Sequence, residues 1–266
     1  MTKPSEATRA LLLKRVEYGE ADFVVTLLTD RFGKVSALAR AAKRSRKRFG
    51  GALELGNVLD ARLTFGRGEL ATLAEARASE VFRTVVRSLD HITLAGAALE
   101  LVRDLVPARE PDERVFECTL EFLRALDRAE PAREELLLAF EVRLMSLVGF
   151  EPSLDACVKT GRRAPEEQPA YFDPELGGIV STEAGGGPVL LSGEARRILR
   201  CAVGSDWHLA AGDASKAWKD TDLSAVRRAV RAFIEARMGR ERRARLLVGE
   251  LQASNPVTVR AKGTAP

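Results

Sequence analysis

The feature that most constrains the fold of this chain is a change of hydrophobic period near residue 80. Before that point apolar and polar residues alternate, as at positions 58–65. A period of two places the apolar residues on one face of a strand. From residue 85 onward apolar residues recur every three or four positions, which is typical of an amphipathic helix. The chain is therefore predicted to be a mixed α+β protein, with strands first and helices after them.

Five short strands are expected in the first 80 residues. They fall at positions 11–16, 23–28, 35–39, 58–65 and 69–76. The last two form a hairpin, because two glycines lie in the short turn between them. Five strands of this length usually close into a small barrel, since an open sheet would leave two edges exposed.

The remainder is predicted to be helical, with one interruption. A stripe of one long helix consists of Val85, Leu89, Ile92, Gly96, Leu99, Val102 and Val106. Residues 150–190 are rich in proline and glycine and are expected to form a loop-rich insert. A last helix is predicted to begin at Asp222, a plausible N-cap, with an interruption at Met238-Gly239. We expect a barrel domain at 1–80, a helical domain at 81–252 containing the insert, and a flexible tail at 253–266.

Charge is distributed unevenly along the chain. The formal net charge is +4, but residues 1–80 carry +5, residues 81–190 carry −8 and residues 191–266 carry +7. Two basic ends around an acidic middle indicate a polyanionic partner more strongly than the mean does.

The most informative stretch, which we call the basic segment, follows the third predicted strand. It contains six cations and no carboxylate: Arg40, Lys43, Arg44, Arg46, Lys47 and Arg48. Such cations repel one another unless a phosphate backbone neutralises them, so this segment on a small barrel predicts nucleic-acid binding. The competing interpretation is a solvated loop that binds nothing. Phe49 is a candidate both for the core and for base stacking.

A second basic surface is a candidate near the C-terminus, formed by Arg240, Arg242 and Arg243. Arginines on helices are often solvated surface. The functional alternatives are contact with a second DNA strand or with an acidic protein tail.

At this point the order of motifs resembles the RecO family of bacterial recombination mediators. The likeness lies in residues 11–22, 26–35, 144–152 and 172–178, and in the basic segment and the hairpin that follows it. It implies an oligonucleotide-binding barrel, a helical domain and a zinc-binding insert. It also implies binding of single- and double-stranded DNA, annealing of complementary strands, and loading of RecA together with RecR. The acidic C-terminal tail of single-stranded-DNA-binding protein is an implied partner. Arg31 and Lys34 join the basic segment in the expected DNA-binding set.

The zinc site of that family is predicted to be lost here. Many members carry two Cys-x-x-Cys pairs, whose positions correspond to Cys157, Thr160, Ser181 and Ala184 in this chain. Structural zinc needs four Cys or His ligands, and one remains. We therefore expect no cofactor.

Catalytic signatures are also missing from the sequence. It contains no phosphate-binding loop motif, and its two histidines leave little scope for acid–base chemistry. A carboxylate-metal nuclease is the remaining enzymatic alternative. The three cysteines form no Cys-x-x-Cys pair and no apolar run is long enough for a membrane span, so we expect a cytoplasmic protein. The resemblance to the RecO family implies that it is associated with the nucleoid during repair. Two non-enzymatic alternatives are a protein-interaction adaptor and an RNA-binding barrel.

Overall fold

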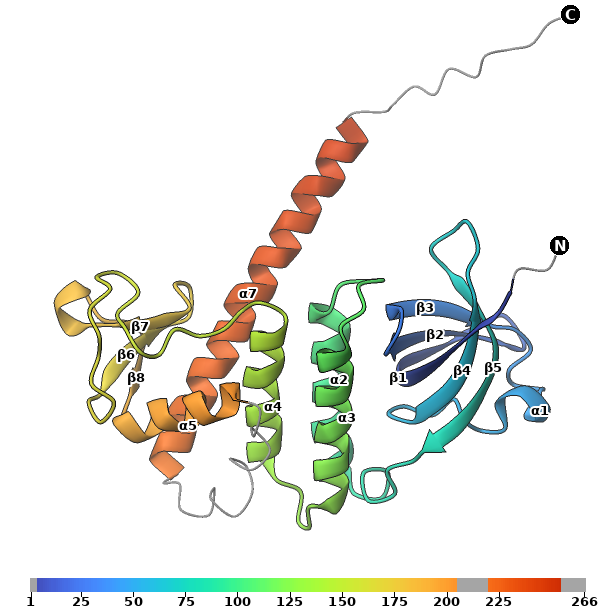
Figure 1. Cartoon of the computed structure of the whole chain (residues 1–266), viewed down its shortest axis with the longest axis horizontal. Coiled ribbons are helices and arrows are strands. Elements are labelled where there is room, and N and C mark those ends of the chain that lie inside the picture. Colours follow the sequence, from blue (N-terminus) through green and yellow to red (C-terminus); the bar gives the residue numbers. More distant parts are fainter. Residues whose placement is uncertain (1–3, 205–219, 255–266) are drawn as a thin grey trace, which may run out of the picture.

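The computed structural model describes residues 4–204 and 220–254, and for residues 220 and 240–254 it describes the backbone alone. Within these ranges the protein is elongated, with a barrel at one end and helices running to the other (Figure 1).

The N-terminal part is a closed five-stranded barrel, as predicted. Its strands are β1 (Glu6–Tyr18), β2 (Asp22–Thr29), β3 (Gly33–Ala39), β4 (Val58–Thr64) and β5 (Ala71–Glu80), with a short helix α1 (Arg46–Phe49) between β3 and β4. The order around the barrel is β1-β2-β3-β5-β4. All pairs are antiparallel except β3 and β5. Closure removes the exposed edges of the sheet.

The alternation along the strands explains the two sides of the barrel wall. On β4, Leu59, Ala61 and Leu63 are buried inside the barrel, whereas Asp60 and Arg62 face outward and are exposed. β1 departs from this pattern because both of its sides are covered. Leu12 faces the barrel interior, while Leu11 and Leu13 belong to the core formed with the helices. The barrel therefore packs against the helical part through an apolar outer face.

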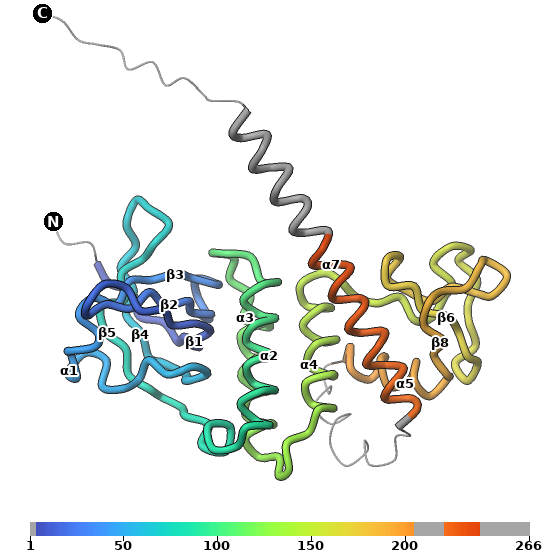
Figure 2. Tube along the Cα trace, turned by 180° about the vertical axis from the view of Figure 1, so that it is seen from behind, coloured from blue at the N-terminus to red at the C-terminus, as the bar shows by residue number. Residues whose placement is uncertain are grey.

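The helical part contains α2 (Leu89–Leu105), α3 (Glu113–Arg128), α4 (Glu134–Leu147), α5 (Gly193–Val203) and α7 (Asp220–Ser254). Figures 1 and 2 both place α2 and α3 between the barrel and α4, with α7 on the far side of α4. The insert before α5 holds a small sheet of order β7-β6-β8, built from β6 (Ala170–Asp173), β7 (Gly178–Val180) and β8 (Val189–Leu191), and the 3-10 turn η1 (Thr182–Ala184).

Two predictions about the helices are wrong. The apolar stripe proposed for α2 is not buried at its N-terminal half, because Leu89 is 78% exposed and Ile92 is 47% exposed. The helix packs instead through the face that carries Leu94 and Ala98. The last helix begins at Asp220, not at Asp222, and it runs without interruption through 238–239.

Candidate nucleic-acid interface

The basic segment lies at one end of the barrel, and its backbone is held firmly. The Asp22 carboxylate accepts a hydrogen bond of 2.7 Å from the Ala41 amide, and the Lys43 amide donates to the Ala21 carbonyl at 3.0 Å. Phe49 is 3% exposed and belongs to the barrel core, so it anchors α1. This settles the alternative left open by the sequence: Phe49 is core and offers no surface for stacking.

The protein's own carboxylates neutralise part of the basic segment. Lys43 forms an ion pair of 2.9 Å with Glu17, and the hydrogen bond from Lys43 lowers the pKa of that carboxyl group. Arg44 lies 3.7 Å from Glu20, but their side chains are 72% and 92% exposed, which makes this pair weak.

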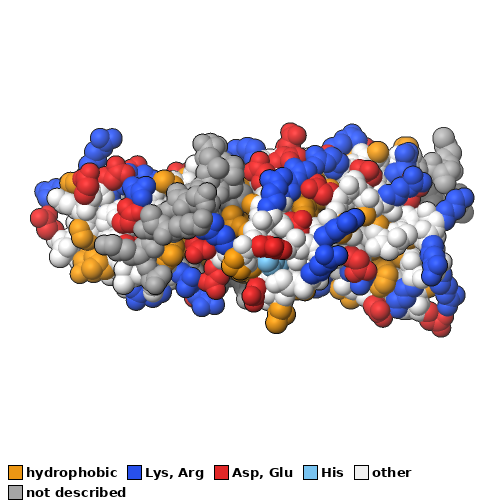
Figure 3. Space-filling model, turned by 90° about the horizontal axis from the view of Figure 1, so that it is seen from below, with side chains coloured by type: hydrophobic (Ala, Val, Ile, Leu, Met, Phe, Trp, Pro, Cys, Tyr) orange, Lys and Arg blue, Asp and Glu red, His pale blue; other side chains and the backbone are white. Residues whose placement is uncertain are grey.

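The other four cations of the segment have no ion pair among the residues that the structure describes: Arg40, Arg46, Lys47 and Arg48. Of these, Arg48 forms hydrogen bonds within the segment, because its guanidinium donates to the Arg40 carbonyl at 2.7 Å and to the Ser45 hydroxyl at 3.1 Å. The outer edge of the barrel end is lined by Lys and Arg side chains in the space-filling view (Figure 3, right). This end therefore keeps cations available for an external anion.

Sequence reasoning missed an aromatic side chain beside these cations. Phe23, on β2, is partly exposed, and its ring centroid lies 5.0 Å from the Arg15 guanidinium and 5.6 Å from the Lys43 ammonium. It lines a hollow of about 420 Å³ that also includes Arg46. Tyr18, at the end of β1, is 60% exposed. Aromatic rings next to phosphate-binding cations are the usual components of a surface that binds single strands.

Arg31 and Lys34 do not lie with the basic segment. Both are near the start of β3, whereas the segment follows its end, and a strand of this length spans about 20 Å. The Lys34 ammonium donates to the carbonyl of Arg103 in α2. Arg31 donates to the Ala7 carbonyl at 2.7 Å. These two cations bridge neighbouring elements at the opposite end of β3 from the basic segment, and their role in DNA binding stays a prediction.

The second basic surface cannot be placed at side-chain level. Its three members lie in the stretch of α7 whose backbone alone is described: Arg240, Arg242 and Arg243. They fall outside the described side chains and stay a prediction.

The four positions that correspond to zinc ligands do come together in the insert. The Cys157 sulfur accepts a hydrogen bond from the Ser181 amide at 3.3 Å, and the Ser181 hydroxyl accepts one from the Ala184 amide at 3.3 Å. Hydrogen bonding from Thr160 and the Ser181 amide lowers the pKa of the Cys157 thiol to about 6. One sulfur among two hydroxyls and a methyl group does not fit zinc, which prefers nitrogen and sulfur ligands. Nor do the described residues include a group of three or more Cys, His, Asp or Glu side chains suited to a metal.

A buried arginine organises the insert. Arg196, on α5, has no exposed surface, and its guanidinium donates to four backbone carbonyls of the loop. The acceptors are those of Leu154 at 2.8 Å, Ala164 at 3.1 Å, Pro165 at 2.6 Å and Gln168 at 2.8 Å. This cation ties the loop from the inside, a role that zinc ligation plays in proteins that have it. Nothing in the sequence pattern distinguishes Arg196 from its solvated neighbours.

Two pairs of adjacent glutamates, Glu134-Glu135 and Glu166-Glu167, belong to no group of potential metal ligands among the described residues. Glu134 forms an ion pair of 2.7 Å with Arg227, and Glu166 forms one of 2.9 Å with Arg200. Both carboxylates are more than half exposed and lie on different elements. The geometry therefore assembles cations and aromatic rings at the barrel end, and the part of the chain that the structure describes forms no group of three or more potential metal ligands there.

A closed five-stranded barrel with a cationic end, joined to a helical domain, defines a class of oligonucleotide-binding-type barrel proteins. Comparison with known families identifies the member of that class: residues 1–82 match the model "Recombination protein O N terminal" and residues 86–246 match "Recombination protein O C terminal". The chain belongs to the RecO family of DNA repair proteins.

Individual relatives agree with this assignment. The chain is 38% identical over 247 residues to the DNA repair protein RecO of Anaeromyxobacter sp. (strain K), covering 91% of this chain and 94% of that protein. It is 37% identical over 186 residues to the RecO protein of Symbiobacterium thermophilum, covering 68% and 73%. For Desulfatibacillum aliphaticivorans the identity is 32% over 204 residues, covering 74% and 79%. Within the described part of the chain, no helix is long and apolar enough to cross a membrane.

Proposed function

We propose that this protein binds single- and double-stranded DNA through the basic segment at the end of its barrel, and that it anneals complementary strands there. The observation that carries the proposal is a set of three exposed cations that lack a carboxylate partner among the described residues: Arg40, Arg46 and Lys47. Phosphates would fill that role, and the release of their counterions would drive binding.

The proposed mechanism has no catalytic step. Two strands bound near one cationic surface repel each other less, because the cations screen their phosphates. Contacts to the backbone position a strand without reading its sequence, so the bases remain able to find their complements. Phe23 and Tyr18 would hold bases of a single strand by stacking. No sequence preference is expected from such contacts.

An annealing assay across a salt series tests this mechanism. We expect the variant Arg44→Glu/Arg46→Glu/Lys47→Glu to lose strand annealing and to show a flatter salt dependence of binding than the wild type. These side chains are exposed, so the variant is expected to fold. Unchanged annealing by that folded variant would refute the assignment. Preference for RNA over a DNA strand of matched sequence would instead favour an RNA-binding barrel.

We further propose that the protein acts as a recombination mediator, helping RecR to load RecA on DNA coated by single-stranded-DNA-binding protein. The support is membership of the RecO family. Docking of the acidic tail of the coating protein belongs to the same proposal. RecA filament assembly on coated DNA, measured with and without this protein and RecR, tests it. Assembly rates that do not respond to either addition would refute the mediator role.

A further inference from the structure

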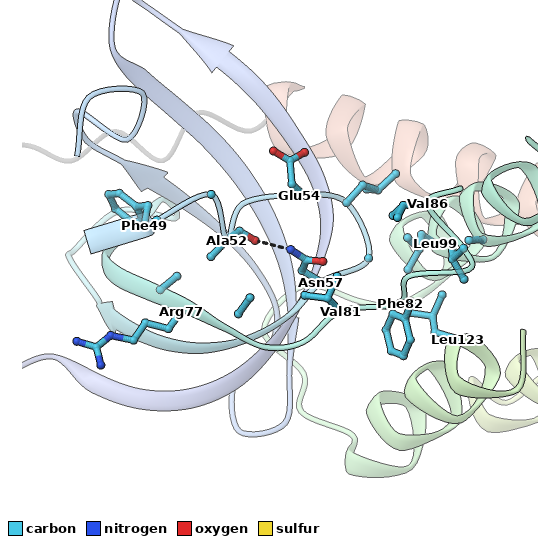
Figure 4. Close-up of a pocket in the computed structure, with 18 of the residues that line it drawn as sticks. Phe49, Ala52, Glu54, Asn57, Arg77, Val81, Phe82, Val86, Leu99 and Leu123 are labelled. Atoms are coloured by element: carbon cyan, nitrogen blue, oxygen red, sulfur yellow. Dashed lines mark hydrogen bonds between the residues drawn. The ribbon is translucent and has the colours of Figure 1, made fainter. Parts of the chain in front are cut away.

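A large groove lies at the join between the barrel and the helices (Figure 4). Its volume is about 950 Å³. One wall is the segment 50–57 between α1 and β4, and the other is the side of α2 around Ile92, Gly96 and Leu99. The end of β5 and the turn at 81–86 close the bottom of the groove.

The groove exposes apolar side chains that a folded protein usually covers. Four of its lining residues are about half exposed: Leu55 at 50%, Val81 at 47%, Val86 at 53% and Ile92 at 47%. Ile92 belongs to the apolar stripe of α2 that the protein's own packing leaves uncovered. A contiguous apolar surface in a concave site marks a place where a ligand binds.

A glycine in the middle of α2 keeps this groove open. Gly96 has ordinary helical backbone geometry, and a Cβ atom added to it would meet nothing within 4 Å. Glycine inside a helix destabilises it relative to alanine, and no close packing here requires the missing side chain. The absence of a side chain at this position therefore widens the groove and serves no packing need.

Cations stand at the rim of the groove. Arg46, Lys47 and Arg77 line it, and none has an ion pair among the residues described. The one carboxylate in the lining, Glu54, is held at 2.9 Å by Arg15. An apolar floor below free cations suits a ligand with an anionic backbone and flat, weakly polar side groups.

We propose that this groove receives unstacked bases of a single DNA strand whose phosphates lie on the basic segment. The inference rests on the function proposed above. Arg46 and Lys47 belong both to the basic segment and to the groove, so a strand that follows these cations reaches the groove directly. The cations at the rim would by themselves also attract an acidic peptide with apolar side chains. The continuity of the groove with the basic segment favours a nucleic-acid strand instead. Paired bases of a duplex cannot enter, so the groove distinguishes single from double strands.

Filling the groove tests the inference. In Gly96→Met the added side chain projects into open space within the groove. Ala97→Met is the matched control, because Ala97 is exposed on the same helix and does not line the groove. We expect Gly96→Met to bind an oligo-dT strand at least about tenfold more weakly, the loss expected when one or two bases lose their contact with the groove. Binding of a duplex of equal length should stay within about twofold of wild type, and Ala97→Met should resemble wild type for both.

A second pair of measurements keeps the test independent of how Gly96→Met folds. Ile92→Glu places a charge at a half-exposed position of the groove and should give the same selective loss. In the wild type, a strand containing 2-aminopurine should gain fluorescence on binding as its bases unstack. Unchanged oligo-dT affinity in both variants, or no fluorescence gain, would overturn the groove assignment.

The failure of this inference and of the proposed function can be told apart. If Arg44→Glu/Arg46→Glu/Lys47→Glu abolishes binding of both DNA forms while the groove variants bind normally, the basic segment binds DNA and the groove does not. If the charge variant binds both forms as wild type does, the proposed function fails. Binding of a fluorescent acidic, apolar peptide that Gly96→Met blocks, with DNA affinity unchanged, would overturn the inference in favour of a protein partner.

Discussion

Replacing the buried Arg196 by methionine tests whether one guanidinium organises the insert. Methionine replaces the aliphatic stem of the side chain and removes every donor. Four backbone carbonyls then lose their hydrogen bonds. All four of these acceptors lie at positions 154–168, so the damage is expected to be concentrated in the insert.

The magnitude follows from how deeply each carbonyl is buried. The bond to the Leu154 carbonyl is fully buried, and leaving that acceptor unpaired costs about 2–3 kcal/mol. The other three bonds are partly buried, and solvent can replace them at about 0.5–1 kcal/mol each. We therefore expect Arg196→Met to lower the free energy of opening of the insert by about 3.5–6 kcal/mol.

Hydrogen exchange measures this opening directly. The amides of Cys157 and Ala164 are bonded within the loop at 2.9 Å, and their exchange should accelerate by about 100-fold or more in Arg196→Met. Arg197→Met is the matched control, because Arg197 is 53% exposed and its ion pair among the described residues is with Glu194 on its own helix. That control should change stability by less than about 0.5 kcal/mol. Equal exchange in the two variants would refute the role given to Arg196.

Three further predictions concern stability, packing and metal binding. Burial raises the pKa of Glu141 to about 7, so the folded state binds a proton more tightly than the unfolded state and stability falls as pH rises from about 4.5 to 7. Glu141→Gln should remove this slope and stabilise the protein at pH 8 by about 3 kcal/mol in urea titrations. Phe49→Ala should destabilise the barrel by about 3–5 kcal/mol, whereas Phe23→Ala should cost less than about 1.5 kcal/mol in the same titrations and weaken single-strand binding instead. The variant Thr160→Cys/Ser181→Cys/Ala184→Cys should bind one zinc ion per chain, and zinc should raise its melting temperature. Metal analysis and thermal melts with and without EDTA measure both effects. A variant that binds no zinc would contradict the proximity of these four positions.

The barrel could be predicted from sequence because its signal is local. On β4, each buried residue alternates with an exposed one, and that alternation is visible without knowledge of the partner strands. The same logic failed on α2. Leu89 and Ile92 have the spacing of a buried stripe, but the helix turns a different face to its neighbours and leaves them exposed. Periodicity reports an apolar face and does not report whether anything covers it.

The candidate site could be predicted only where it is contiguous in sequence. The basic segment is such a run, and the structure keeps it together at one end of the barrel. Phe23 and Arg15 escaped notice because strand pairing, not sequence proximity, brings them beside Lys43. For Lys34, closeness in sequence does not mean closeness in space. It lies a few residues before the basic segment in the chain but at the opposite end of β3.

The salt dependence of single-strand affinity tests the central claim most directly. The measured quantity is the slope of log affinity against log salt concentration. It is compared between the wild type and the variant Arg40→Gln/Arg46→Gln/Lys47→Gln. This variant neutralises the three exposed cations of the basic segment that have no ion pair among the described residues. The control removes three cations that are paired on the helical part and in the insert: Arg114→Gln/Arg162→Gln/Arg197→Gln.

Each lost phosphate contact lowers the slope by about 0.7, so the first variant should lose about 2 while the control matches the wild type. Equal slopes in all three proteins would contradict the account, because the basic segment would then contribute nothing to holding the strand.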